Sequence, residues 1–269
     1  MKSEWQIIVD GANSADEQMA ADERLAQRAQ LTARFFEWQP AAISLGWKQP
    51  RPEWLEPDAW RGDKLEWVER PTGGGIAFHG SDVSVAVVVL RAKGVSLALL
   101  MRAVCQSAVR LCTSYGIDAS ALLEAPSHGR IAYCLTQHSP YAVLVDGRKV
   151  AGFALRRYPA SWLIQGSLLI NPLPEILQRM LPVSVGEAIQ RRAVSLSVAS
   201  GASLDEADVM RRWAAHWTSW WPHHLPTSTD GGRPVKQEST MMLARRHPTS
   251  YRSAEPTILL TCRPREVVG

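Results

Sequence analysis

The segment from Arg70 to Ala77 reads Arg-Pro-Thr-Gly-Gly-Gly-Ile-Ala and has the composition of a loop that binds a ligand. Three consecutive glycines lose much backbone entropy on folding, so they do little to stabilise a turn. They leave backbone amides open to close approach, and Arg70 adds a guanidinium suited to a carboxylate or a phosphate. A glycine-rich hairpin turn is the alternative interpretation. The spacing fits neither a Walker loop nor a dinucleotide-binding fingerprint.

Four cysteines are the next residues that could do chemistry: Cys105, Cys112, Cys134 and Cys262. Their spacing is not that of a metal site. Thiols of cytoplasmic proteins are usually reduced, so any of the four could be a free nucleophile. Cys105 and Cys112 share an apolar stretch with helical spacing, which predicts that both lie in the core. Cys262 lies near the end of the chain without supporting context.

Strands are expected on both sides of the glycine-rich segment, at 65–69 and 83–90, because both segments are short and largely apolar. Further strands are expected at 5–9, 35–38, 42–46, 131–135, 141–145, 149–155, 162–170 and 257–260. Asp146-Gly147 between two of these strands predicts a tight hairpin. Helices are expected at 15–34, 95–115, 173–181 and 204–221, with a helical turn at 58–63 and loops at 50–57 and 227–237.

Residues at the ends of the expected helices fit known capping patterns. Asn13 or Ser14 can cap the first helix, and Gly116 is suited to end the second. Ser203-x-x-Glu206 has the spacing of a capping box before the last helix. These patterns predict where three of the helix ends lie.

The last expected helix carries four tryptophans at helical spacing beside a pair of arginines. The tryptophans are Trp213, Trp217, Trp220 and Trp221. Aromatic and basic side chains together can bind nucleic-acid bases by stacking. An amphipathic helix that packs its indole rings into the core explains the same spacing and is the interpretation that the pattern favours.

The composition is that of an ordinary soluble globular protein, with 46% hydrophobic and 21% charged residues among 269. The net charge of +4 is too diffuse to indicate nucleic-acid binding. We see no apolar stretch long enough to span a membrane and no signal peptide, so we expect a cytoplasmic protein. Strands and helices intermix without strict alternation, which predicts an α+β or mixed-sheet α/β fold.

Five motifs in a fixed order give the chain a family resemblance. They are Met-Ala-Ala-Asp-Glu at 19–23, Ser-Leu-Gly-Trp-Lys-Gln at 44–49, the glycine-rich segment with His79, Asp-Gly-Arg-Lys-Val-Ala-Gly at 146–152, and Gln-Gly-Ser-Leu-Leu at 165–169. Together they resemble the lipoate–protein ligase A and lipoyl(octanoyl)transferase superfamily, which also includes biotin protein ligase. The resemblance implies a mixed sheet with flanking helices around a narrow apolar tunnel. It also implies a catalytic domain at 1–225 and an extension at 226–269 that packs on it.

The same resemblance implies an enzyme that attaches octanoyl or lipoyl groups to one lysine of a small carrier domain. Lys149 is implied as a catalytic residue whose amine points toward the reacting carbonyl. The residues implied at the substrate are Arg70, Thr72, Gly73, Gly74, Gly75, His79, Gly152, Ala154 and Gly166.

Cys134 lies fifteen residues before Lys149, where the cysteine-loop octanoyltransferases of this superfamily carry their nucleophile. The resemblance therefore implies that Cys134 holds the acyl group as a thioester, while the Lys149 ammonium lowers the pKa of the thiol and stabilises the oxyanion. A buried structural cysteine and a solvated lysine remain the alternatives for these two residues.

Three functions stay open, and the favoured one is an acyltransferase. It would take an octanoyl group from acyl carrier protein and pass it to lipoyl domains of 2-oxoacid dehydrogenases or to glycine-cleavage H protein, with no cofactor, no metal, no nucleic acid and no membrane. An ATP-dependent lipoate–protein ligase would need ATP and Mg²⁺, and Cys134 would then be incidental. A non-catalytic acyl-binding partner subunit is the third. About 100 residues follow Leu169, little for an accessory domain, which favours the transferase.

Three residues depart from the family pattern. Glu69 stands where a second arginine is common, Phe153 replaces a small residue, and Gln165 replaces a histidine. These changes alter the charge beside Arg70 and could shorten or redirect the tunnel. They motivate a diverged substrate preference or reduced activity.

Overall fold

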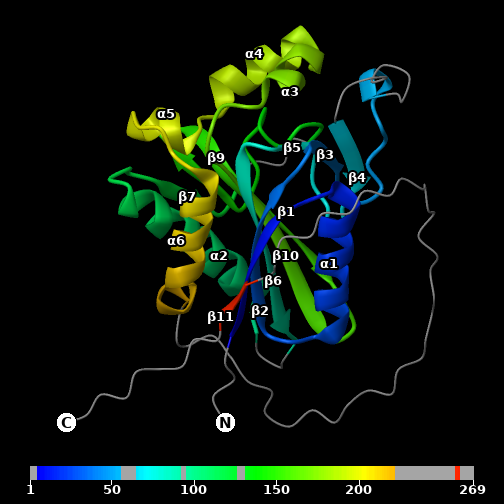
Figure 1. The fold of residues 1–269 in the computed structure, drawn as a ribbon, viewed down its shortest axis with the longest axis vertical. Helices are drawn as coiled ribbons and strands as arrows, with labels where there is room; N and C mark the ends of the chain where they lie inside the picture. The colour runs from blue at the N-terminus through cyan, green and yellow to red at the C-terminus, as the bar shows by residue number, and fades with distance from the viewer. Residues whose placement is uncertain (1–4, 56–64, 92–94, 126–130, 222–257, 261–269) are drawn as a thin grey trace.

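A computed structural model describes residues 5–55, 65–91, 95–125, 131–221 and 258–260. These residues form one large and one small β-sheet, with helices on both faces of the large sheet (Figure 1). The mixed α/β architecture confirms the predicted fold class.

The large sheet has eight strands. They are β1 (Gln6–Asn13), β2 (Thr32–Trp38), β6 (Asp82–Leu90), β7 (Ser120–Leu122), β8 (Ala142–Val145), β9 (Arg148–Arg157), β10 (Ser161–Leu169) and β11 (Ile258–Leu260). Their spatial order is β11-β1-β2-β6-β10-β9-β8-β7, with β1 and β2 parallel and the other neighbours antiparallel. The small sheet has the order β4-β3-β5, from β3 (Ala41–Leu45), β4 (Leu65–Glu69) and β5 (Ala77–His79).

Six α-helices and one short 3-10 helix complete the described part of the chain. The α-helices are α1 (Ala15–Arg28), α2 (Leu97–Ser114), α3 (Glu175–Met180), α4 (Val183–Arg192), α5 (Leu196–Ser200) and α6 (Glu206–Trp220), and the 3-10 helix is η1 (Glu53–Leu55). In Figure 1, α1 lies on one side of the large sheet and α2 and α6 lie on the other. None of these helices is long and apolar enough to cross a membrane.

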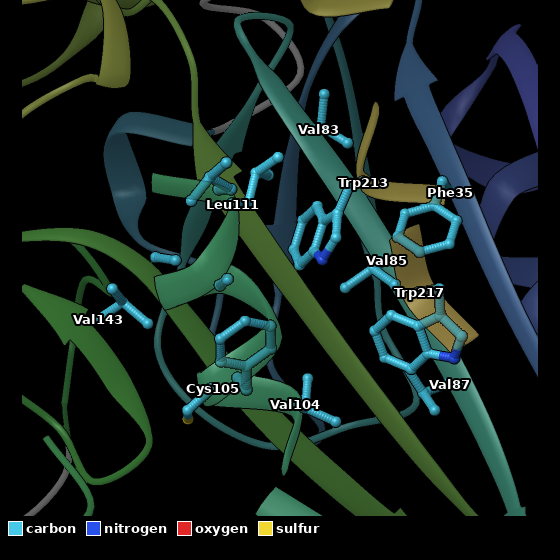
Figure 2. Close-up of a cluster of buried hydrophobic side chains, with 14 of the residues drawn as sticks. Phe35, Val83, Val85, Val87, Val104, Cys105, Leu111, Val143, Trp213 and Trp217 are labelled. Carbon is cyan, nitrogen blue, oxygen red and sulfur yellow. The ribbon is translucent and has the colours of Figure 1, made fainter. Parts of the chain in front are cut away.

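Alternate residues of the central strands face two different cores. Phe35, Val85 and Val87 belong to the cluster that packs against α2 and α6 (Figure 2). Phe36 and Val88 belong to the cluster on the α1 side. A period of two is the normal side-chain alternation of a strand, so β2 and β6 are covered on both faces.

The tryptophans of α6 fill the α2–α6 core, as the sequence pattern favoured. Trp213 and Trp217 are fully buried, and their ring centroids lie 5.4 and 5.6 Å from that of Phe35. Cys105 and Cys112 are also fully buried there, and burial raises the pKa of both thiols to about 12. The prediction that these two cysteines are core residues is confirmed.

The small sheet packs against α3 and α4 in a third apolar cluster. Ile43 of β3 and Phe78 of β5 contribute to this cluster from the sheet, and Leu177 and Ile189 contribute from the helices. The small sheet holds the chain on both sides of the glycine-rich segment, because β4 ends at Glu69 and β5 begins at Ala77.

The first helix is shorter than predicted. It ends at Arg28, and Ala29 takes a left-handed conformation with φ of 50°. The chain then enters β2 at Thr32, so residues 32–34 are strand and not helix. The prediction was wrong because the apolar period of two in β2 overlaps the end of the helical pattern, and pairing with β1 and β6 decides the conformation.

The caps were predicted with mixed success. Ser14, one of the two predicted candidates, caps α1 and forms a capping box with Glu17. The last helix is capped by the carboxylate of Asp205, which accepts from the Asp208 amide, and not by Ser203. The hairpin turn is confirmed, since Asp146 and Gly147 have φ of 49° and 72°, the positive values of a type I′ turn.

Segment 131–135 is not a strand. It forms a turn with a single bridge between Tyr133 and Ile76. Five elements were not expected from the sequence: η1, which lies in the loop expected at 50–57, and β5, β7, α4 and α5. The helical turn expected at 58–63, the loop at 227–237 and Cys262 lie outside the described residues, and the domain division at 225/226 stays a prediction.

Candidate active site

A cavity of about 440 Å³ lies where the glycine-rich segment, the turn at 131–141 and strands β9 and β10 meet. Most side chains around it are apolar or aromatic, as is usual for a site that binds a small molecule. Among its lining residues are Cys134, Lys149 and every predicted substrate residue except Thr72, namely Arg70, Gly73, Gly74, Gly75, His79, Gly152, Ala154 and Gly166. The structure therefore brings together residues that are far apart in the sequence.

The Arg70 guanidinium holds the glycine-rich segment in shape. Its Nη1 donates to the backbone oxygen of Ser44 at 2.9 Å, and its Nη2 donates to the oxygens of Gly73 and Gly75 at 2.9 and 2.7 Å. Nη2 also lies 3.9 Å from the sulfur of Cys134. Arg70 is thus a buried cation that organises the backbone and faces the thiol.

Glycine is required where this segment meets its neighbours. A Cβ on Gly75 would lie 2.9 Å from the carbonyl oxygens of Ile131 and Ala132, which is too close for a side chain. Gly74 has φ of 99°, a conformation that favours glycine. The hairpin alternative is wrong, because β4 and β6 lie in different sheets.

Cys134 lies in the turn at 131–141 and is half-buried. Its backbone amide donates to the Ile76 oxygen at 2.8 Å, which ties the turn to the end of the glycine-rich segment. Its thiol donates to the Gly75 oxygen at 3.1 Å. The sulfur therefore lies at the cavity wall between a carbonyl oxygen and the Arg70 guanidinium.

Lys149 approaches Cys134 from β9 and is 3% exposed. Its Nζ donates to the backbone oxygen of Cys134 and to Ser139 Oγ, each at 2.9 Å. Burial lowers the pKa of Lys149 below its ordinary 10.5, and the charge of Arg70 lowers it further. A Cβ on Gly152 would lie 2.9 Å from Nζ, so the glycine leaves room for the amine.

His79 lines the cavity and is buried among polar and aromatic partners. Its two ring nitrogens lie 2.8 Å from Ser44 Oγ and 2.9 Å from Asp82 Oδ2. The ring stacks on Trp38, with centroids 4.0 Å apart. The histidine is therefore held in place from three sides.

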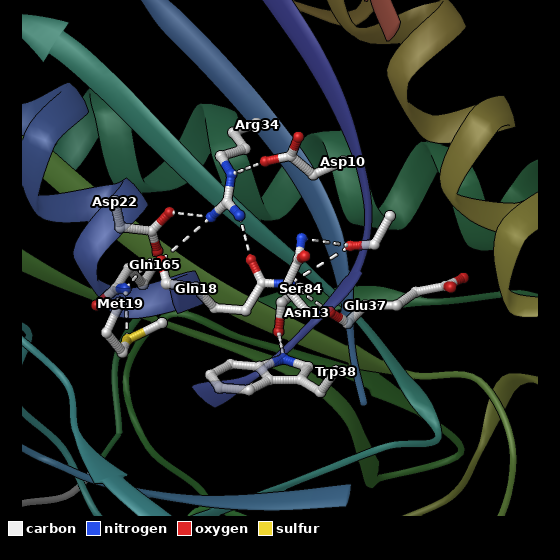
Figure 3. A network of polar contacts seen from close by, with 11 residues as sticks. Asp10, Asn13, Gln18, Met19, Asp22, Arg34, Glu37, Trp38, Ser84 and Gln165 are labelled. Atoms are coloured by element: carbon white, nitrogen blue, oxygen red, sulfur yellow. Dashed lines mark hydrogen bonds and ion pairs between the residues drawn. The ribbon is translucent and has the colours of Figure 1, made fainter. Parts of the chain in front are cut away.

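Thr72 reaches the cavity wall through Gln165. Its hydroxyl donates to Gln165 Oε1 at 2.8 Å, and Gln165 Nε2 donates to Asp22 at 2.6 Å. Asp22 in turn pairs with Arg34 at 2.6 Å (Figure 3). Gln165, the departure from the family histidine, thus links the glycine-rich segment to a buried ion pair under α1.

The pKa values of two buried carboxyl groups in this region shift in opposite directions. Asp22 is fully buried, and burial raises its pKa above 3.8 although Arg34 and Gln165 lower it. Burial also raises the pKa of Asp82, but His79, Ser167 and the Gly80 amide outweigh it and hold that pKa below 3.8. The carboxylate with more donors keeps its charge more easily.

The other two departures lie in different places. The Phe153 ring lies over Gly166, where any Cβ would clash with it, and both residues line the cavity. Glu69 is exposed at the end of β4. Phe153 therefore bears on the shape of the cavity.

Sequence reasoning missed Ser44, Asp22 and Arg34 as parts of this region. Ser44 opens the second family motif and Asp22 lies in the first, so both had a positional signal. Arg34 had none, because it was assigned to a helix and not to β2. Only the strand register places its guanidinium against α1.

A model of the lipoyl protein ligase A/B catalytic domain matches residues 13–218. The chain therefore belongs to this family, which is the one that the five ordered motifs resemble. Two curated relatives, the octanoyltransferases LipM of Symbiobacterium thermophilum and Lysinibacillus sphaericus, are each 28% identical to it. The first match covers 80% of this chain and 85% of the relative, and the second covers 75% and 80%.

Solved structures show the same fold at low sequence identity. A lipoate-protein ligase A bound with ATP has a TM-score of 0.63 and 17% identity, over 81% of this chain and 86% of that one. A bipartite lipoate protein ligase of Thermoplasma acidophilum, described with its E2 lipoyl domain, has a TM-score of 0.64 and 16% identity, over 80% and 82%. These matches agree with the predicted lipoate ligase fold.

Proposed function

We propose that the chain is an octanoyltransferase of protein lipoylation that carries the acyl group as a thioester on Cys134. The observation that carries this proposal is the half-buried Cys134 thiol at the wall of a largely apolar cavity, with the Lys149 amine 2.9 Å from the Cys134 carbonyl oxygen. Family membership and the curated octanoyltransferase relatives support the same reaction.

The reaction has two balanced steps. In the first, the Cys134 thiolate attacks the carbonyl carbon of an octanoyl thioester of acyl carrier protein. A C–S bond to Cys134 forms, the bond to the donor sulfur breaks, and the donor thiol leaves with the proton that Cys134 gave up. In the second, the amine of the acceptor lysine attacks the same carbon. A C–N bond forms, the C–S bond breaks, and a proton from the amine returns to Cys134.

Arg70 and Lys149 both assist these steps. The Arg70 guanidinium lies 3.9 Å from the sulfur, so it favours the thiolate. Lys149 has a lowered pKa because it is buried, so its amine can lose and regain a proton more readily than an exposed lysine. We assign Arg70 to thiolate stabilisation and Lys149 to proton transfer.

The partners follow from this reaction. The donor is acyl carrier protein, and the acceptors are lipoyl domains of 2-oxoacid dehydrogenases or glycine-cleavage H protein in the cytoplasm. The Thermoplasma acidophilum neighbour, which is described with an E2 lipoyl domain, supports an acceptor of this kind. Exchange between two thioesters is nearly isoenergetic, so no nucleotide is needed, whereas a lipoate ligase would need ATP and Mg²⁺.

Mass spectrometry tests the proposal. Octanoyl-acyl carrier protein without ATP should place an octanoyl group on the peptide that contains Cys134 and then on an added lipoyl domain. Cys134→Ser should abolish both products, and Cys112→Ala, which changes a buried core thiol, should retain both. Product only with ATP, Mg²⁺ and free lipoate would establish a ligase instead. Acyl binding without a modified carrier under either condition would establish an acyl-binding subunit.

A further inference from the structure

A chain of buried hydrogen bonds runs from Asp82 to Arg70 beside the cavity. Asp82 Oδ2 lies 2.9 Å from His79 Nδ1, and His79 Nε2 lies 2.8 Å from Ser44 Oγ. Arg70 Nη1 donates to the same Ser44 oxygen at 3.1 Å. Ser44, His79 and Asp82 are 1%, 4% and 2% exposed. The three have the contact order of a Ser-His-Asp triad, with a guanidinium on the serine oxygen.

Asp82 decides the direction of these hydrogen bonds when the His79 imidazole is neutral. This carboxylate also accepts from the Ser84 and Ser167 hydroxyls and from the Gly80 amide, and its pKa is low, so it acts only as an acceptor. A neutral imidazole must therefore carry its proton on Nδ1 and accept at Nε2. The Ser44 hydroxyl then donates to His79 and presents its lone pairs to Arg70.

Arg70 connects these hydrogen bonds to the thiol of Cys134. Its other nitrogen, Nη2, holds the Gly73 and Gly75 oxygens and lies 3.9 Å from Cys134 Sγ. A guanidinium is planar, so fixing Nη1 on Ser44 also fixes the direction of Nη2. The position of the cation at the thiol therefore depends on a serine on β3.

We propose that Ser44, His79 and Asp82 are positioning residues that act through Arg70 and hold its guanidinium where it stabilises the Cys134 thiolate. The inference rests on the proposed thioester function. Loss of the Ser44 hydroxyl leaves Arg70 bonded to the backbone oxygens of Ser44, Gly73 and Gly75 but removes its hydrogen bond of 3.1 Å to the Ser44 side chain. The thiol should then be less reactive, although the cavity lining loses only the Ser44 hydroxyl.

The test measures the rate at which iodoacetamide alkylates Cys134, followed by peptide mass mapping so that Cys262 does not contribute. Ser44→Ala should slow alkylation about tenfold, as for the loss of one charged hydrogen bond, and should lower kcat of octanoyl transfer by a similar factor with KM little changed. His79→Gln replaces the accepting ring nitrogen by an amide oxygen that can accept from Ser44, so it should retain more reactivity than His79→Ala.

Ser107→Ala is the matched control. Ser107 is also 1% exposed, and its hydroxyl bonds to the Val104 oxygen at 2.7 Å and to Trp213 Nε1 at 3.2 Å in the α2–α6 core. It should lower the melting temperature without slowing alkylation. Equal slowing in the two variants, unchanged alkylation in Ser44→Ala, or an octanoyl ester on Ser44 would each overturn the positioning role.

The alkylation assay needs no acyl donor, so it separates this inference from the proposed function. A wild-type chain that transfers no octanoyl group would overturn the octanoyltransferase proposal. The dependence of Cys134 alkylation on Ser44 would still decide the positioning role.

Discussion

The two faces of the large sheet use the same strands but have opposite chemistry. Phe35 faces α2 and α6, where it packs with Trp213 and Trp217 (Figure 2). Arg34, one residue earlier, faces α1 and pairs with Asp10 and Asp22 (Figure 3). Both side chains are at most 2% exposed. One strand thus buries an aromatic ring on one side and a charge on the other.

We expect the α2–α6 face to serve mainly the stability of the fold and the α1 face to serve mainly the geometry of the site. Burying apolar area stabilises the fold roughly in proportion to that area, so the α2–α6 face is where we expect most of the folding energy. A buried ion pair contributes little net stability, yet removing one partner is costly. The α1 face is connected through Gln165 to Thr72 of the glycine-rich segment, so this face bears on the geometry of the candidate site.

Truncation of the apolar face should give the largest effect on stability. Trp213→Ala should lower the free energy of unfolding by about 3–5 kcal/mol, because it leaves a cavity in the α2–α6 core. Octanoyl transfer per folded molecule should be unchanged at a temperature where the variant is folded. Urea unfolding measures the stability, and a transfer assay measures the activity. A loss of activity in fully folded protein would contradict the view that the α2–α6 face serves stability and not the site.

Removing a buried charge from the α1 face should lower both the stability of the protein and its rate of octanoyl transfer. Asp22→Asn should lower the free energy of unfolding by about 2–3 kcal/mol, since Arg34 keeps Asp10 but loses one of its charged partners. Transfer should also slow, because Gln165 loses a charged acceptor. The matched control is Asp16→Asn, an exposed residue in the first turn of α1, which should cost a few tenths of a kcal/mol at most.

Lys149→Met should raise the stability of the protein and abolish its activity. Because a buried ammonium is costly, the variant should gain about 1–2 kcal/mol near neutral pH and lose octanoyl transfer. The pKa of Lys149 is lowered on folding, so between that pKa and 10.5 the unfolded chain binds more protons at this residue, and its contribution to wild-type stability should rise with pH. The buried Cys105 and Cys112 thiols, with their raised pKa of about 12, lower the stability of both proteins as the pH rises above 9.0. The measurement is therefore the difference: urea unfolding across alkaline pH should show the stability advantage of Lys149→Met over the wild type shrinking as the pH rises.

Thr72→Val should have the smallest effect of the four. It removes the hydroxyl that donates to Gln165 at 2.8 Å and should cost about 1 kcal/mol of stability. KM for the octanoyl donor should rise, because the glycine-rich segment loses its contact with β10. Thr72→Ser keeps the hydroxyl and should behave like the wild type; if both variants behave alike, the hydroxyl is not the relevant group.

Local chemistry in the sequence decided several features before any contact was known. Asp146-Gly147 gave a type I′ turn because both residues tolerate positive φ. The helical spacing of the tryptophans in α6 favoured their burial, which Trp213 and Trp217 show, and the largely apolar segment at 83–90 predicted a strand there, which is β6. The five ordered motifs indicated the family, and most of the residues they named line one cavity.

Tertiary structure decided the rest, because it depends on contacts between distant segments. Residues 131–135 have the composition of a strand, yet they turn so that Cys134 can meet Gly75, 59 positions earlier in the chain. Arg34 became a strand residue through its register with β1 and β6. The sequence determined which groups could do chemistry, and packing determined which of them meet, since a hydrogen bond of 3 Å requires a geometry that spacing along the chain does not fix.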